Sequence, residues 1–143
     1  KRLKFMAGYN YTNKLKFIDF KNQLSKYISY EEIHDGMYVS VNNNIDIPLE
    51  LDLEKDRYYL VKILFEDINN LGSINLKYGF SESSNKSKSQ RYLVFKENNL
   101  DKIQVQLKCF YPLPYKVFLK GILVIPLNKI SLQKDDIERL VYN

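Results

Sequence analysis

Short runs of alternating apolar and polar residues recur about every dozen residues along this chain, and this rhythm strongly limits its possible folds. In the stretch IQVQLKC (103–109), apolar side chains alternate with Gln104, Gln106 and Lys108. Successive side chains of a strand point to opposite faces, so this stretch predicts a strand with one buried and one wet face. Turn-forming sequences such as NNLG and YPLP separate the runs. Together these features predict an all-β protein, an antiparallel β-sandwich of the jelly-roll type.

About eight strands follow from this pattern, at residues 14–20, 37–41, 45–51, 58–65, 73–80, 91–95, 102–110 and 115–127. Residues 58–65 are apolar on both faces, which predicts a central strand with Tyr58 and Tyr59 in the core and their hydroxyls at the rim. Pro48 marks an edge or a break. Gly121, inside the last strand, predicts a bulge or a bend.

Helix signals are few. Residues 135–143 predict a short C-terminal helix with Asp135 as its N-cap. Residues 20–33 are compatible with one helical turn or with a loop, and residues 81–91 predict a solvated loop. We expect one domain over residues 1–143, and the missing initiator Met predicts that it is a fragment of a longer protein.

The formal net charge of +5 and the pI of about 9.1 describe a mild basic excess. Such an excess permits an anionic partner but requires none, and we expect no nucleic acid partner because the electrostatic signature is weak. No apolar stretch has the length of a membrane span. The single cysteine, Cys109, excludes a disulfide within the chain and is expected to pack as a small hydrophobe.

Catalytic chemistry has little support in this sequence. The only histidine, His34, lies in an apparent turn, so a hydrolytic triad or a zinc site is not expected. Glu50 and Asp52 share one face of a strand, which is not the two-sided geometry of glycoside hydrolysis. We therefore predict a protein that is not an enzyme and has no cofactor. A structural Ca²⁺ near Asp46, Asp52 or Asp56 stays open, without the spacing of a Ca²⁺ loop.

Two parts of the sequence resemble jelly-roll, galactose-binding-like β-sandwich domains. In NNNIDIPLELDLEKDRYYLVKILFEDINNLGSINLKYGF (42–80), an x-L-x-L strand leads through a charged turn into Y-Y-x-x-x-I-x-F, as in the opening half of such domains. IQVQLKCFYPLPYKVFLKGILVIPL (103–127) is similar to their end, where an x-x-G-I-x-V strand returns beside the first. The resemblance covers residues 33–130, about two thirds of the chain. Bacterial accessory domains of this kind occur beside glycosyltransferases and glycoside hydrolases.

The resemblance implies a non-catalytic accessory domain that binds a glycan or an anionic cell-surface glycopolymer for a bacterial polysaccharide enzyme. The catalytic domain would be part of the same chain, at the cytoplasmic face of the membrane or at the cell surface. Since Trp is absent, stacking would fall to tyrosines. The predicted ligand contacts are Tyr38, Tyr92, Tyr111 and Tyr115 for stacking, and Lys86, Lys88 and Arg91 for charge.

An alternative function is an oligomerisation or assembly module of the parent protein. Residues 115–127 are apolar on both faces and would suit the interface of a homo-oligomer. The two hypotheses predict different behaviour of the isolated domain, a monomer that binds a ligand or a stable oligomer.

Overall fold

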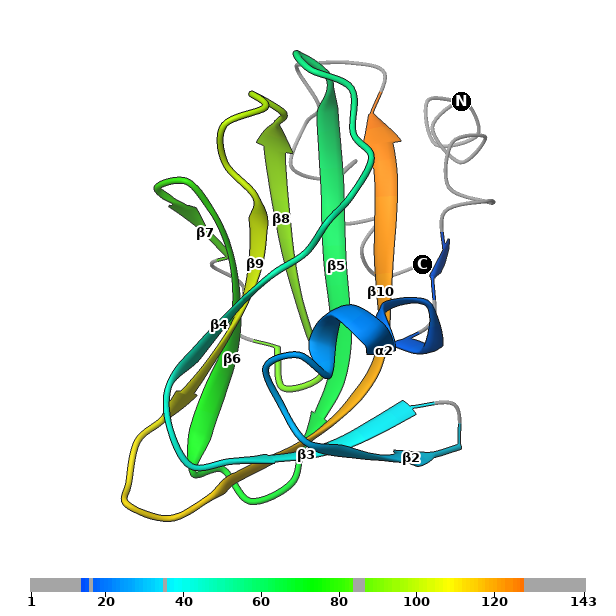
Figure 1. Ribbon diagram of the computed structural model, residues 1–143. Coiled ribbons are helices and arrows are strands. Elements are labelled where there is room, and N and C mark those ends of the chain that lie inside the picture. Colours follow the sequence, from blue (N-terminus) through cyan, green and yellow to red (C-terminus); the bar gives the residue numbers. More distant parts are fainter. Residues whose placement is uncertain (1–13, 16, 35, 84–86, 128–143) are drawn as a thin grey trace.

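The computed structural model describes residues 14, 15, 17–34, 36–83 and 87–127 of the chain (Figure 1). Two antiparallel sheets pack face to face, which confirms the predicted β-sandwich. One sheet has the order β2-β3-β10-β5-β8 with β1 also paired to β10, and the other has the order β4-β9-β6-β7. The elements are β1 Lys14–Leu15, α2 Phe17–Leu24, β2 Tyr30–Ile33, β3 Gly36–Val41, β4 Ile45–Pro48, β5 Tyr58–Asp67, β6 Gly72–Tyr78, β7 Ser81–Glu82, β8 Gln90–Lys96, β9 Ile103–Cys109 and β10 Tyr115–Leu127.

Strand β5 lies in the middle of the larger sheet, between β10 and β8, and is apolar on both faces. Its inward residues, among them Val61 and Phe65, are buried in the main core between the sheets. On the outer face Leu60 forms a second, smaller buried cluster with Ile125 and Leu127. Tyr59 is buried and its hydroxyl accepts a hydrogen bond from Glu54 N at 2.9 Å. The predictions of a central strand and of a buried Tyr59 are therefore confirmed, whereas Tyr58 is only half-buried, against the outer cluster.

Strand β9 lies inside the smaller sheet, between β4 and β6, and turns Val105 and Leu107 into the main core. Its outer face is only partly wet. Lys108 is exposed, as the alternation predicts, but Gln106 is buried and its Nε2 donates to Asp46 Oδ1 at 3.1 Å. A glutamine can be buried in this way because its amide nitrogen keeps a polar partner, although Oε1 of Gln106 has none.

The region predicted as a strand at residues 14–20 is different in the structure. Only Lys14–Leu15 is a strand, and helix α2 follows at Phe17–Leu24. Phe20, Leu24 and Ile28 are spaced by four residues and are all buried in the main core. This helical period outweighs the short alternation that precedes it, because burial of apolar side chains decides between competing local patterns.

Two other predicted features are found with changed bounds. Strand β4 ends at Pro48, which removes a backbone donor, rather than at residue 51. The loop predicted at residues 81–91 begins with the short strand β7. The register of β10 against β5 shifts between Leu119 and Gly121, so the predicted bulge is confirmed. The predicted helix at residues 135–143 lies outside the described residues.

Candidate functional site: a groove between two loops

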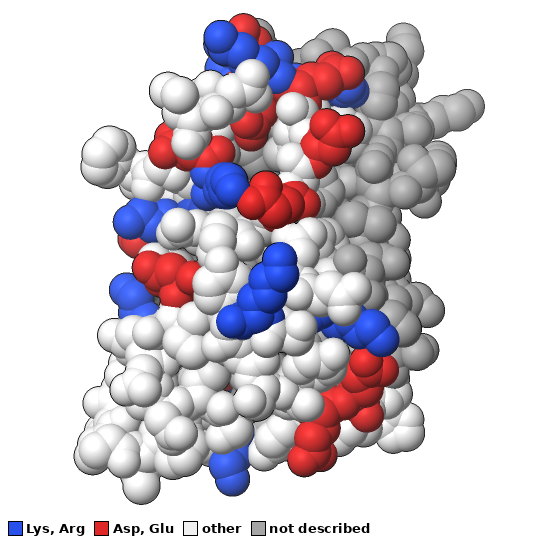
Figure 2. Space-filling model, viewed as in Figure 1, with Lys and Arg blue, Asp and Glu red and all other residues white. Residues whose placement is uncertain are grey.

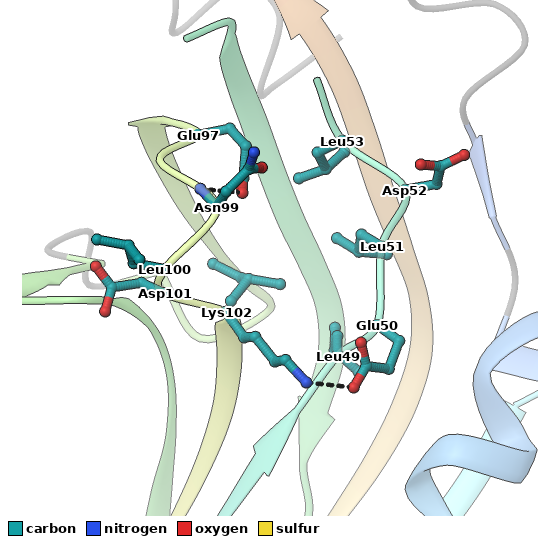
Figure 3. Close-up of a pocket in the computed structure, with 11 residues that line it drawn as sticks. Leu49, Glu50, Leu51, Asp52, Leu53, Glu97, Asn99, Leu100, Asp101 and Lys102 are labelled. Atoms are coloured by element: carbon teal, nitrogen blue, oxygen red, sulfur yellow. Dashed lines mark hydrogen bonds and ion pairs between the residues drawn. The ribbon is translucent and has the colours of Figure 1, made fainter. Parts of the chain in front are cut away.

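An open pocket of about 230 Å³ lies between residues 49–53 and residues 97–103 at one end of the sandwich (Figure 3). We call it the groove. Its volume is somewhat below the ~300–1,000 Å³ of pockets for drug-sized ligands. The groove is therefore of a size for one small ligand or for one unit of a larger chain.

The first wall of the groove is residues 49–53, which continue from β4 in an extended form (Figures 1 and 3). Leu49 N donates to Ile103 O at 2.9 Å, which joins the two walls at the base. Gln23 of α2 holds the other edge of this wall, because its amide donates to Glu50 O at 3.2 Å and accepts from Glu50 N at 2.7 Å. Leu51 and Leu53 point toward the second wall (Figure 3).

The second wall is the β8–β9 loop, and Asn98 organises it. Asn98 Oδ1 accepts hydrogen bonds from Leu100 N at 2.8 Å and from Asp101 N at 2.9 Å. Asn98 N donates to the Tyr78 hydroxyl at 2.8 Å. Asn99 has a φ of 62°, a left-handed conformation that Asn adopts more readily than most residues. The asparagine pair thus explains how this tight loop forms.

The buried carboxylate of Glu97 stabilises the β8–β9 loop. Glu97 is 7% exposed, and its Oε2 accepts a hydrogen bond from Asn99 N at 2.8 Å (Figure 3). The Tyr78 hydroxyl lies 3.2 Å from Glu97 Oε1. Burial, followed by the charge of Glu97, raises the pKa of Tyr78 above its usual value, although the hydrogen bond from Asn98 opposes this. Tyr78 is therefore a neutral hydrogen-bonding group at physiological pH.

An ion pair between Lys102 and Glu50 joins the two walls (Figure 3). Around it the surface is acidic, although the whole protein is basic. The loops 49–57 and 97–102 together carry six carboxylates and three cations, a net formal charge of −3. Charged side chains gather in the corresponding upper part of the molecule in Figure 2. The groove therefore combines an apolar wall with groups that accept hydrogen bonds, in a negative potential.

Phe80 lies in the turn between β6 and β7, beside the groove, and is fully exposed at 105% of its reference area. The preceding Gly79 has a φ of 59°, and a Cβ added to it would lie 2.9 Å from Asp101 Oδ2. The turn that presents Phe80 is thus in contact with the second wall. Sequence alternation placed Phe80 on the face of a strand. The Gly-Phe-Ser sequence, typical of a turn, was the signal for its exposure.

The structure does not bring the predicted ligand contacts together at the groove, and none of the six that are described lines it. Tyr38 and Tyr92 are half-buried on β3 and β8. Tyr111 is exposed in the loop 110–114, and Lys88 is exposed before β8. Lys86 lies outside the described residues.

The side chains of Tyr115 and Arg91 make contacts within the domain and are not open to a ligand. Tyr115 is fully buried and donates a hydrogen bond to Asp67 Oδ2 at 3.0 Å, so its ring offers no face for stacking. The Arg91 guanidinium lies 5.1 Å from the centre of the Phe65 ring and donates to the carbonyl oxygens of Ser87 and Gln90. Burial lowers the pKa of Arg91 and raises that of Tyr115. These two contact predictions have no support at their positions.

Within the described ranges, no group of three or more His, Cys, Asp and Glu side chains is placed to hold a metal ion. That finding includes Asp46, Asp52 and Asp56, the carboxylates considered for Ca²⁺. No described helix has the length and apolar character needed to cross a membrane. His34 is exposed in the turn between β2 and β3.

Comparisons with known proteins give no family for this chain, since no family model matches it and no curated protein sequence matches it either. The groove and its surroundings are therefore interpreted from their own chemistry.

Proposed function

We propose that this domain is a non-catalytic module that binds a glycan in the groove. The observation that supports this proposal is the mixed composition of the two walls, where leucine side chains lie beside amide, carboxylate and ammonium groups. A sugar ring has apolar C–H faces and polar hydroxyl edges. Such a ligand matches a site that offers both kinds of surface.

The expected contacts follow from the directions of the side chains in Figure 3. Leu51 and Leu53 would pack against the C–H face of a sugar. Asn99 and the Lys102–Glu50 pair would exchange hydrogen bonds with hydroxyls, because together they offer both donors and acceptors. Phe80 would stack on a neighbouring unit of the chain, beyond the second wall.

The charge of the groove selects among glycans. A net charge of −3 on the two loops repels phosphate and uronate groups and favours neutral or amine-bearing sugars. The basic excess of the whole protein suggests an anionic glycopolymer, but carboxylates outnumber cations on the two loops of the groove. We therefore propose a neutral or amino sugar as the unit bound here.

The alternative of an assembly module has less support. Strand β10, the suggested interface, exposes only Lys120 among its residues, and the apolar ones are buried or half-buried within the domain. An oligomer would need a different surface. We therefore propose that the domain acts as the glycan-binding accessory of a polysaccharide enzyme, as the resemblance implies.

Titration calorimetry with neutral, amine-bearing and uronate-bearing oligosaccharides tests the proposal. We expect millimolar or tighter binding of the first two classes, weakened about tenfold in Asn99→Gly, which preserves the backbone conformation. Lys108→Ala, on the outer face of β9, is the matched control and should bind as the wild type does. The proposal would be contradicted if the wild type bound none of the three classes. It would also be contradicted if Asn99→Gly and Leu51→Ser both bound as tightly as the wild type.

A further inference from the structure

The end of the sandwich opposite the groove has no charged residue in its three loops, residues 42–44, 68–71 and 110–114. In the whole protein 27% of residues are charged, so this absence is unusual. The loops instead expose large apolar side chains, with exposures from 44% to 60%, namely Ile68, Phe110, Tyr111 and Leu113. The lower left of Figure 2 is accordingly almost free of charge. We call this surface the uncharged end.

Side-chain amides satisfy the backbone of the uncharged end. Asn69 donates to Pro114 O at 2.9 Å and accepts from Lys116 N at 3.1 Å and from Leu71 N at 3.3 Å. Asn44 Oδ1 accepts from Cys109 N at 2.8 Å.

The apolar loop itself has few backbone donors to satisfy. Phe110 N donates to Leu71 O at 3.0 Å, and Pro112 and Pro114 have no backbone N–H at all. A backbone with so few open donors is suited to a surrounding of low polarity, where an unpaired N–H is costly.

Lysines stand around this end. Lys108 and Lys116 flank the loop 110–114 in the sequence. Lys88 belongs to the same end, because its neighbour Ser89 accepts a hydrogen bond from Phe65 N, near the end of β5. Carboxylates close to these loops in the chain are Asp46 and Glu66, which are exposed, and Asp67. Both oxygens of Asp67 accept hydrogen bonds, Oδ1 from Asn70 N and Oδ2 from the Tyr115 hydroxyl. Exposed apolar side chains flanked by lysines would fit a partner that has an apolar interior and an anionic surface.

We propose that the uncharged end docks on a lipid bilayer, with Ile68, Phe110, Tyr111 and Leu113 in the interfacial region and the lysines at anionic headgroups. Tyr and Phe are favoured at this boundary because they present an apolar body, and Tyr adds a polar tip. A second copy of the chain is a poorer fit. A stable dimer needs about 800 Å² from each partner, far more than four side chains on two loop tips present. The docked domain would hold its groove away from the membrane.

Sedimentation with vesicles of phosphatidylcholine, with or without roughly one third phosphatidylglycerol, tests the docking. We expect wild-type protein to bind the anionic vesicles and to bind them less at high salt. The Phe110→Ser, Tyr111→Ser double variant should lose about tenfold or more in partitioning, because two exposed aromatic rings no longer leave water. Lys108→Gln with Lys116→Gln should reduce only the part of binding that depends on phosphatidylglycerol.

Phe80→Ser is the matched control, since it removes an even more exposed ring at the opposite end. It should bind vesicles as the wild type does. No vesicle binding by the wild type, or an equal loss in the control, would overturn the proposal. Self-association that Phe110→Ser abolishes, without vesicle binding, would instead assign this end to a protein contact. The result does not depend on glycan binding, because the groove variants should keep full vesicle binding.

Discussion

Asn69 and Asn98 have the same role at opposite ends of the sandwich, although the surfaces around them differ. Each side chain ties together the backbone of a tight connection, Asn69 across two loops and Asn98 within one. The loops around Asn98 carry a net charge of −3, whereas those around Asn69 have no charge at all. A neutral amide scaffold therefore leaves the surface chemistry of a loop free to vary.

The comparison also shows where whole-protein averages fail. A net charge of +5 suggests an anionic ligand for the molecule as a whole, but the groove has acidic walls. Binding follows the local potential, because charges beyond about 10 Å are screened at physiological salt. The two ends must be tested separately. Each substitution at one end is therefore paired with a similar substitution at the other end.

Gly72→Ala and Gly79→Ala should give the largest difference between the ends. A Cβ at Gly72 would lie 2.6 Å from Tyr115 Cγ, in a buried site that cannot move aside, and should cost about 3 kcal/mol of unfolding free energy. At Gly79 the neighbour is the far end of the flexible Asp101 side chain, which accepts a hydrogen bond from Asn98 Nδ2, so the cost should be about 1–2 kcal/mol from the positive φ. Urea unfolding measures both. Equal costs would mean that the uncharged end is not the more tightly packed.

Asn69→Ala should cost about 2 kcal/mol, because Pro114 O and Lys116 N lose their partners in a half-buried place. Asn98→Ala should cost a similar amount. If the ends are independent, the double variant should lose the sum within about 0.5 kcal/mol. Urea unfolding of the three variants measures this, and a clearly smaller combined loss would show that the two ends are coupled.

Tyr115→Phe and Tyr78→Phe should differ from the wild type in their response to alkaline pH. Burial raises the folded-state pKa of both tyrosines above the value of about 10 in the unfolded chain. The stabilising effect of each neutral hydroxyl is thus complete below pH ~10 and is lost as the pH rises further. Each variant should be less stable by about 1 kcal/mol at neutral pH, and the gap should narrow above pH ~10.

Thermal unfolding from neutral to alkaline pH checks this. The narrowing should be greater for Tyr115, which is fully buried, than for Tyr78 at the groove end. Identical pH profiles of wild type and Tyr115→Phe would contradict the predicted ionisation.

Lys102→Ala should have the smallest effect on stability, below about 1 kcal/mol, because its ion pair with Glu50 is largely exposed. It removes one cation from the acidic groove, so binding of an amine-bearing sugar should become slightly tighter and that of a neutral sugar weaker. Lys116→Ala at the other end should change neither. Calorimetry with both sugars measures the difference, and opposite trends would contradict the proposed role of the charge.

The sequence predicts most of the strands, because alternation records directly which side chains face the core. It does not predict α2, since Lys14 and Leu15 begin a strand-like alternation that a helix interrupts two residues later. The alternation does not predict strands β2 and β7 either. Their burial patterns are mostly exposed, so they have no apolar face for alternation to reveal.

The groove was beyond sequence analysis for a topological reason. Glu50 and Lys102 are fifty-two positions apart, and only the pairing of β4 with β9 brings them together. Tyr115 is an example of a predicted ligand contact that is buried in the structure. An aromatic residue at the start of a strand looks the same in a sequence whether it is exposed or buried. Its hydrogen bond to Asp67 across the β5–β10 pair decides the matter.

Gln23 donates one hydrogen bond to the backbone of Glu50 and accepts another from it, and these two bonds hold the outer edge of the first wall of the groove. The Gln23 side chain bonds to the backbone of Glu50 as a neighbouring strand would. These two hydrogen bonds can break while all the strand pairings of both sheets stay intact. The wall can thus open by a local fluctuation, far more often than the domain unfolds. The Glu50 amide should exchange its proton with solvent faster than the amides of β9, and a bound ligand should slow that exchange.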